Sequence, residues 1–186
     1  MRNNTQKIYE RLSKGEFLSV DSIDISTRHL FNDIEENLED YTYYFKEIGL
    51  KLESGNGYFY FSRLGETKQT IEQKLESFSK WLDYLDFLKC YNQSFTAGYQ
   101  FRKSHLMEQL SMDIELKEKA GHLFKKYNAS SNAEIINKLL QELQTMGFAE
   151  CISEQDETYK VISAFHYAED LVDMIELNVS CPHAME

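Results

Sequence analysis

The chain of 186 residues is 42% hydrophobic and 13% aromatic, which is ample for packed cores and disfavours disorder. Its 31 acidic residues outnumber its 20 basic ones, for a net charge of −11. Nucleic acid, whose tight binding engages roughly 6–10 basic side chains, would therefore need a local basic patch. No apolar run is long enough for a transmembrane span, and the amino terminus lacks the apolar stretch of a signal peptide, so we expect neither.

The amino-terminal segment is predicted to form a short helix and then a long one. Ile8 and Leu12 lie four positions apart before Gly15, which suits a short helix and its stop. The segment EFLSVDSIDIS follows as a connector of partly extended character. From about His29, apolar residues recur at steps of three and four, which predicts one long amphipathic helix ending before Gly49. The apolar stripe of that helix comprises Leu30, Phe31, Ile34, Leu38, Tyr41, Phe45 and Ile48.

The next stretch, IGLKLESGNGYFYFSR over residues 48–63, is predicted to form a β-hairpin. LKLE alternates in polarity, SGNG supplies glycine and asparagine for a tight turn, and YFYFSR returns as a second strand. Because an isolated hairpin this apolar cannot bury its own faces, we expect the aromatic face to cover the helices of its own domain. A helix followed at once by a hairpin is the arrangement at the end of a winged-helix domain.

The second half of the chain repeats this order. A helix is predicted over roughly 66–92 and is broken at NQSFTAG, after which FRKSHLMEQLS and DIELKEKAGHLFKKYN are predicted to be helical. Ser131 and Glu134 have the spacing of a capping box that starts the next helix, and Gly147 ends it. FAECISEQDETYKVI is predicted to be a second hairpin turning at EQDE, followed by a last helix near residues 163–177.

The same order of helices and hairpin occurs in both halves of the chain. This repetition predicts a fold that is mostly α with small β-hairpins (α+β), built from tandem winged-helix domains joined by a long helix. The predicted boundaries are residues 1–65 for the first winged-helix domain, 66–98 for the connecting helix and linker, 99–177 for the second domain with its carboxyl-terminal helix, and 178–186 for a tail.

No motif indicates catalysis, a cofactor or a metal site. GNG lies between two predicted strands and lacks the phosphate-binding frame, and no serine or cysteine lies in a nucleophile motif. Cys181 and His183 bring a thiol near an imidazole, but no second pair accompanies them to complete a zinc site. Cys90 is interpreted as a buried, inert thiol, and the three cysteines as reduced thiols of a cytosolic protein. We therefore expect a protein that is not an enzyme.

The predicted winged helices could read DNA or bind protein. Winged helices usually read DNA with the helix that precedes the hairpin. The first such helix is strongly acidic, and the second offers Asn137, Lys138 and Gln141 beside two glutamates. The wings are poor in basic residues apart from Arg63 and Lys160. Protein binding is therefore favoured, with a winged-helix DNA-binding transcriptional regulator and a dimeric adaptor without a chromosomal role as the alternatives.

The segment LSKGEFLSVDSIDISTRHLFNDIEENLEDYTYYFKEIGLKLESGNGYFYFSR resembles the start of the MukE proteins and of their shorter MksE relatives. In those proteins, a short stretch of small and basic residues is followed by a short extended segment, an acidic helix rich in aromatic residues and a hairpin whose turn contains glycine. TIEQKLESFSKWLDYLDFLKCY occupies the place of their long connecting helix. The resemblance covers residues 8–92, and over 101–177 it is mainly architectural.

This resemblance implies a non-catalytic accessory subunit of a bacterial SMC-type condensin, of the MukBEF or MksBEF type, that regulates chromosome organisation and segregation. Such subunits form homodimers and bind the kleisin subunit (MukF or MksF) and, through it, an SMC-like ATPase. The resemblance also implies a cytoplasmic, nucleoid-associated protein without a cofactor or membrane contact, and with DNA bound only weakly or within the complex.

Two sets of residues are candidate contact sites. Tyrosine is stable both in a protein core and at the solvent-exposed edge of an interface. The first domain contains more tyrosines than the apolar stripe of its one predicted long helix requires. The candidate anchors of a dimer or partner interface are Tyr41, Tyr43, Tyr44 and Tyr58, with completion of the domain core as the alternative. The candidates for a weak DNA contact are Arg102, Lys103, Lys117, Lys119, Lys125 and Lys126.

Overall fold

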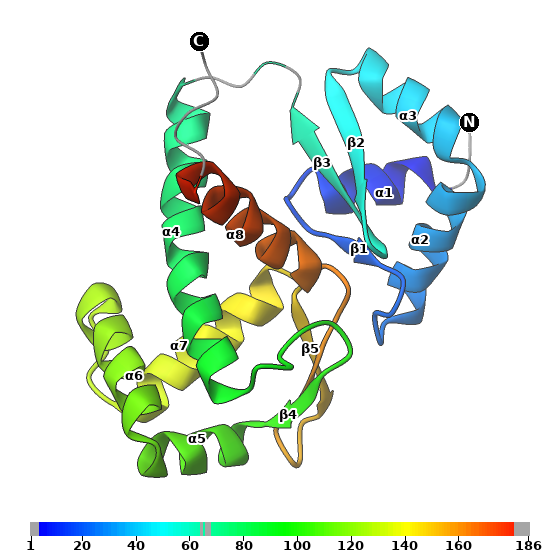
Figure 1. The fold of residues 1–186 in the computed structure, drawn as a ribbon. Coiled ribbons are helices and arrows are strands. Elements are labelled where there is room, and N and C mark those ends of the chain that lie inside the picture. Colours follow the sequence, from blue (N-terminus) through cyan, green and yellow to red (C-terminus); the bar gives the residue numbers. More distant parts are fainter. Residues whose placement is uncertain (1–3, 64, 66–67, 181–186) are drawn as a thin grey trace.

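The computed structural model of the chain describes residues 4–63, 65 and 68–180, without the side chains of residues 68–78, 124, 126–127 and 173–180. Within these ranges the chain forms eight helices and six strands, arranged as two repeats (Figure 1). The first repeat comprises α1 (Thr5–Leu12), β1 (Leu18–Ser19), α2 (Ile25–Glu36), α3 (Leu38–Glu47), β2 (Leu50–Gly55) and β3 (Tyr58–Arg63). The second comprises α4 (Lys68–Tyr91), β4 (Gln100–Arg102), α5 (Lys103–Met112), α6 (Ile114–Tyr127), α7 (Asn132–Thr145), β5 (Ala149–Ser153), β6 (Thr158–Val161) and α8 (Phe165–Ser180). The predicted mixed α+β class is confirmed.

Each repeat contains one small antiparallel sheet with the same strand order. In the first sheet β3 lies between β1 and β2, and in the second β6 lies between β4 and β5. The register pairs Leu18 with Phe59 in the first sheet, and Phe101 with Tyr159 in the second. Both predicted hairpins are therefore confirmed. The expected helical start at Phe101 is wrong, because Phe101 and Arg102 pair with β6 before α5 begins.

The long helix predicted from about His29 to Ile48 is wrong, because two helices occupy this segment. α2 begins earlier, at Ile25, where the carboxylate of Asp24 caps two backbone amides. α2 and α3 meet at Asn37, whose backbone leaves the helical region and whose side-chain amide donates to the carbonyl of Asp33 at 2.9 Å. Such side chain to backbone bonds compete with helix propagation, which explains the break.

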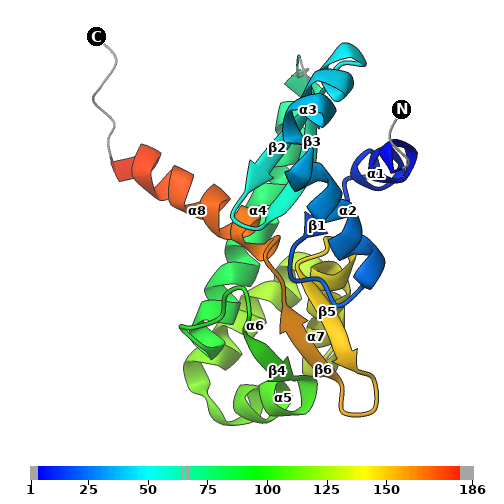
Figure 2. The ribbon, with the colours of Figure 1, turned by 90° about the vertical axis from the view of Figure 1, so that its right-hand side faces the viewer.

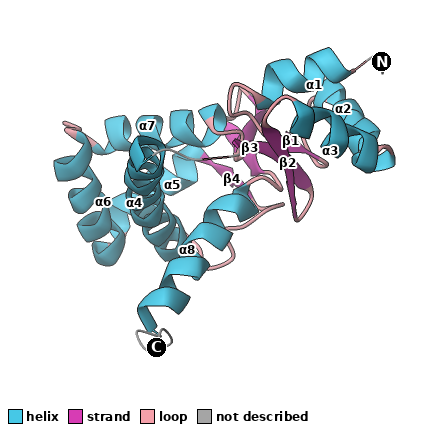
Figure 3. Ribbon diagram, turned by 90° about the horizontal axis from the view of Figure 1, so that it is seen from above, coloured by secondary structure: helices cyan, strands magenta, loops and turns pink. Residues whose placement is uncertain are grey.

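Two clusters of buried apolar side chains stabilise the repeats. The smaller cluster joins α1, α2, α3 and the hairpin, with Ile8, Ile34 and Phe45 fully buried. The larger cluster joins the elements of the second repeat and also includes Tyr58 from the first. Viewed from above, the strands lie between α1–α3 on one side and α4–α7 on the other (Figure 3).

The first hairpin uses both of its faces, and the expectation that an aromatic face covers the helices of its own domain is confirmed for one of them. On one face, the ring centroid of Phe59 lies 4.9 Å from that of Phe31, and the centroid of Phe61 lies 4.6 Å from that of Phe45. On the other face, Tyr58 and Tyr60 point toward the second repeat, where both lie against Tyr167 of α8. The hairpin is therefore packed between the two repeats.

Gly121 offers a simple stability prediction. It lies inside α6, and apart from its chain neighbours and the adjacent backbone of that helix, no heavy atom of the described residues comes within 4 Å of a Cβ built on it. Alanine has less conformational freedom than glycine in the unfolded chain and a higher helix propensity. Gly121→Ala should therefore raise the free energy of unfolding by about 0.5–1 kcal/mol. Urea denaturation measures this change. Gly49→Ala is the control of opposite sign, since Gly49 has open space but a φ of +81°.

Candidate partner-binding surfaces

An aromatic junction joins the two repeats. The ring of Phe17 lies between the hairpin and the second repeat, with its centroid 5.6 Å from those of Tyr58 and Tyr60, 5.5 Å from that of Phe148 and 5.1 Å from that of Tyr167. The last two rings belong to the second repeat. Burial raises the pKa of the Tyr60 hydroxyl to about 12. Because these rings come from both repeats, the junction fixes one repeat against the other.

A polar contact, the inter-repeat clasp, lies beside this junction. The clasp joins the loop after β1 to the outer face of β5 and β6 (Figure 2). The Asp21 carboxylate accepts from the amide of Ser163 at 2.8 Å and pairs with Lys160 at 3.2 Å. The Glu150 carboxylate accepts from the hydroxyl of Ser22 at 2.6 Å. The clasp therefore joins residues more than a hundred positions apart.

The clasp makes stability depend on pH. Burial opposes ionisation of Asp21, but hydrogen bonds from Ser163 and the charge of Lys160 outweigh it and lower the Asp21 pKa below its ordinary value. A lowered pKa in the folded state adds stability that is present above the ordinary carboxyl pKa, about 4, and is lost as pH falls through the lowered value. At neutral pH, Asp21→Asn should therefore cost about 1–2 kcal/mol.

Urea denaturation at several pH values measures this cost. The difference between the unmodified chain and Asp21→Asn should shrink below about pH 4, as Asp21 becomes protonated. Asp156→Asn, at an exposed carboxylate of the β5–β6 turn, is the control and should change stability little at any pH. A difference for Asp21→Asn that stays constant from neutral to acidic pH would contradict this role.

The structure separates the four candidate tyrosines into two pairs. Tyr41 and Tyr58 are only 2% and 3% exposed. The Tyr41 hydroxyl donates to Asp33 at 2.8 Å, and Tyr58 belongs to the aromatic junction. Tyr43 and Tyr44 on α3 are 68% and 37% exposed. Only this second pair therefore presents its rings at the surface of the chain.

The exposed face of α3 combines apolar and acidic groups. Leu38 and Ile48, at the two ends of the helix, are 41% and 51% exposed, although the predicted stripe placed both in the core. Glu39 and Asp40 occupy its first turn, and a hydrogen bond from Tyr43 to Glu47 raises the pKa of the tyrosine. This face disfavours phosphate and suits a polypeptide partner.

The six candidate DNA contacts are not all available to a ligand. Arg102, Lys117 and Lys125 are exposed. Lys103 pairs with Glu157 at 2.6 Å, and Lys119 pairs with Asp86 at the same distance. The side chain of Lys126 lies outside the described residues. Of the five candidates whose side chains the structure describes, three, on β4 and α6, are therefore exposed.

The positions usually used to read DNA carry little spare positive charge. On α7, Lys138 pairs with Glu134 at 2.8 Å, while Asn137 and Gln141 are exposed. Lys160, which we predicted as one of the few basic wing residues, is bound to Asp21 in the clasp. Arg63 at the end of β3 is exposed. Neither α7 nor the two hairpins therefore forms a basic surface.

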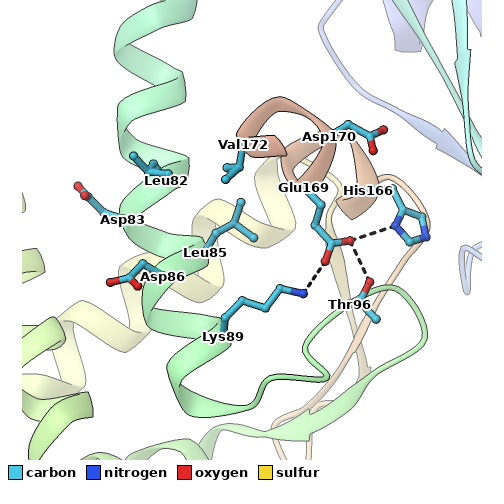
Figure 4. A pocket seen from close by; sticks show the side chains of 10 residues that line it. All are labelled: Leu82, Asp83, Leu85, Asp86, Lys89, Thr96, His166, Glu169, Asp170 and Val172. Carbon is cyan, nitrogen blue, oxygen red and sulfur yellow. Dashed lines mark hydrogen bonds and ion pairs between the residues drawn. The ribbon is translucent and has the colours of Figure 1, made fainter. Parts of the chain in front are cut away.

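The packing of α8 against α4 leaves an open groove of about 780 Å³ (Figure 4). Leu82 and Leu85 from α4 and Val172 from α8 point into the space between the two helices. We call this space the α4–α8 groove. Leu85 is 5% exposed, whereas Leu82 remains 40% exposed, so the groove has an apolar floor that solvent reaches.

Glu169 organises one end of the α4–α8 groove. Its carboxylate accepts from the ammonium of Lys89 at 2.6 Å and from the hydroxyl of Thr96 at 2.9 Å, and it lies 3.0 Å from Nδ1 of His166 (Figure 4). These partners come from α4, the loop before β4 and α8. Glu169 therefore joins the start of α8 to α4 and to the loop before β4, and it neutralises Lys89, the one lysine among the described residues that line the groove.

The other polar groups of the described residues do not form a metal site. These residues contain no group of three or more side chains that could hold a metal ion, and none of their helices combines the length and the hydrophobicity of a membrane span. Cys90 and Cys151 are unpaired thiols, and burial raises the pKa of Cys90. The predicted Cys181 and His183 pair lies outside the described residues.

Comparison with known families places these surfaces in context. The family model described as condensin complex protein MksE matches residues 3–172 of the chain. The match spans both repeats, including the aromatic junction, the clasp and the α4–α8 groove as far as Val172. Among curated proteins, no match to the chain was found.

Proposed function

Because the chain belongs to the MksE family of condensin complex proteins, we propose that it is a non-catalytic accessory subunit of a bacterial SMC-type condensin. The family match over residues 3–172 carries this proposal. The subunit would bind the kleisin-type protein and, through it, the SMC-like ATPase, and would regulate chromosome organisation in the cytoplasm at the nucleoid. The resemblance of residues 8–92 to MukE and MksE points to the same role.

Each repeat is proposed to be a winged-helix domain. The support is the common order of helix, short strand, helices and hairpin, and the common strand order in which the returning hairpin strand is central. The boundaries proposed are 1–65 for the first domain, 66–98 for the connecting helix and linker, 99–177 for the second domain and 178–186 for the tail.

Self-association is proposed to use the exposed face of α3. Tyr43 and Tyr44 are the anchors, because their rings are exposed whereas Tyr41 and Tyr58 are buried within the chain. Light scattering should give twice the chain mass of 21.9 kDa. Tyr43→Ala should shift the species toward monomer, and Tyr9→Ala, at an exposed tyrosine on α1, should not. A monomer at tens of micromolar, or equal behaviour of both variants, would contradict this interface.

DNA is proposed to be contacted only when partners bring it close. The net charge of −11 opposes independent binding, while Arg102, Lys117 and Lys125 remain exposed for a weak contact. In a gel-shift assay on random duplex at moderate salt, the purified chain should bind little. Tight binding by the chain alone would instead favour the transcriptional-regulator alternative.

Co-purification tests the main proposal. The tagged chain, expressed with the kleisin-like and SMC-like proteins encoded beside its gene, should retain the kleisin-like protein directly and the SMC-like protein only when the kleisin-like one is present. Retention of neither protein, or of the SMC-like protein alone, would overturn the accessory role.

The assembled complex also allows a test of the DNA contact. Lys125→Glu should lower the affinity of the complex for DNA and reduce the salt dependence of that affinity.

A further inference from the structure

From its geometry and charge, we infer that the α4–α8 groove binds an amphipathic helix of a partner polypeptide, with Lys or Arg side chains flanking an apolar stripe. This inference rests on the proposed function, because an accessory subunit acts by docking other polypeptides. It adds the place of docking and the chemistry of the docked segment.

The floor of the groove provides the apolar part of this recognition. Leu82, Leu85 and Val172 lie along the space between two helices (Figure 4). A helix that docks in such a groove presents apolar residues at a spacing of three and four, and these would contact the three side chains. Leu82 has the most surface to lose, because it is 40% exposed on an otherwise packed part of α4.

The rim of the groove provides the charge. Asp83 and Asp86 project from the side of α4 that faces away from α8, and Asp170 projects from the side of α8 that faces away from α4, where Tyr58 donates a hydrogen bond to it, so the carboxylates flank the groove on its outer edges. With Glu169 and Lys89, the described residues of the lining carry four carboxylates and one ammonium group, for a net charge of −3 with histidine neutral. Lys119 binds Asp86 at 2.6 Å from outside the lining, which reduces this net charge to −2.

This charge selects among occupants. Nucleic acid is disfavoured, because the acidic rim repels its phosphates. A basic helix gains from both features, since its aliphatic residues cover the floor while its cationic groups meet the rim. Lys and Arg stems also pack well along apolar surface while their charged ends reach outward.

A synthetic helix is the direct probe. We would use a fluorescent, helix-stabilised peptide of about 18 residues, which is about five turns, with leucine at positions i, i+4, i+7 and i+11 and lysine on both flanks. A matched peptide carries glutamate in place of every lysine. Fluorescence anisotropy with the full chain should detect binding of the lysine peptide, weakened by added salt, and no comparable binding of the glutamate peptide. Equal binding of both peptides, or binding of neither, would overturn the inference.

Two substitutions locate the binding. Leu82→Arg should weaken the lysine peptide by about tenfold or more, because it removes apolar contact and adds a like charge. Ile114→Arg is the matched control, since Ile114 is a 74% exposed aliphatic residue on α6 outside the groove, and it should leave the affinity unchanged. Asp83→Asn, which keeps the shape of the rim, should weaken binding by about two- to threefold and reduce its salt dependence.

The outcome separates this inference from the proposed function. If co-purification with the kleisin-like protein succeeds but Leu82→Arg binds the lysine peptide as tightly as Ile114→Arg, the accessory role stands and the groove assignment is wrong. If co-purification fails while the peptide binds and responds to Leu82→Arg, the groove binds basic helices but the accessory role is wrong. Light scattering should give the same oligomeric state with and without the peptide, and a higher oligomeric state in its presence would contradict docking of one helix per chain.

Discussion

Phe17→Ala should lower the free energy of unfolding by about 3 kcal/mol, at the lower end for a phenylalanine in a core because Phe17 is only partly buried. Its ring contacts Tyr58 and Tyr60 of the first repeat and Phe148 and Tyr167 of the second. Alanine would therefore leave a cavity at the aromatic junction, where rings from both repeats meet. The loss should be larger than for any single bond of the clasp.

The same substitution should separate the unfolding of the two repeats. Trp81 is the only tryptophan of the chain and packs 4.8 Å from Phe148, centroid to centroid, so its fluorescence reports the second repeat. Far-UV circular dichroism reports helices of both repeats. In the unmodified chain the two signals should change together during urea denaturation, whereas in Phe17→Ala their midpoints should differ.

Tyr9→Ala is the control for the Phe17 prediction. Tyr9 is 43% exposed on α1, so its removal should change stability by no more than about 0.5 kcal/mol and leave the two signals coincident. Equal stability losses for Phe17→Ala and Tyr9→Ala would show that the aromatic junction contributes little to holding the repeats together.

Gly55→Ala should destabilise the same junction by overfilling it. A Cβ built on Gly55 would lie 2.0 Å from the Cζ atom of Tyr58, which no packed structure permits. The Tyr58 ring cannot move aside easily, because it is 3% exposed and lies against Phe17 and Tyr167. Overpacking of this kind costs typically about 1–3 kcal/mol, and we expect the upper part of that range.

A double-mutant cycle tests the stated cause. In a Tyr58→Ala background the clash disappears, so adding Gly55→Ala should cost less than about 1 kcal/mol, although each single change is costly. Gly49→Ala is a second control, because Gly49 has a φ of +81° and open space and should show only the cost of a strained backbone, about 1–2 kcal/mol. Additive losses from Gly55→Ala and Tyr58→Ala would exclude steric contact with the ring as the cause.

Local patterns were sufficient for most elements of the fold. The helix predicted over 66–92 is observed as α4 over Lys68–Tyr91, because its periodicity is long and no proline interrupts it. The hairpin at 48–63 is observed because Gly57, with a φ of +80°, provides the tight turn between alternating strands. The hydroxyl of Ser131 accepts from the amide of Glu134 at 3.2 Å, as its spacing predicts. Each of these features depends on residues close together in the chain.

Errors arose where a local pattern had two interpretations. An apolar stripe continues through Asn37 because α2 and α3 both pack on the same small core, so periodicity alone could not reveal the break. Leu38 and Ile48 fit the stripe by spacing but remain exposed once the helix is divided. Tyr41 and Tyr43 differ by two positions, and only the packing of α3 decides that one ring is buried and the other exposed.

The order and spacing of residues were therefore enough to indicate an α+β chain of two similar halves and its MksE family. Folding decided which surfaces remain available to partners. Asp21 meets Ser163 across 142 positions, and the α4–α8 groove exists only because α8 returns to α4 after the whole second sheet is formed. Such contacts produce no periodic pattern in the amino-acid sequence, because their geometry depends on how separate elements pack and not on neighbouring residues along the backbone.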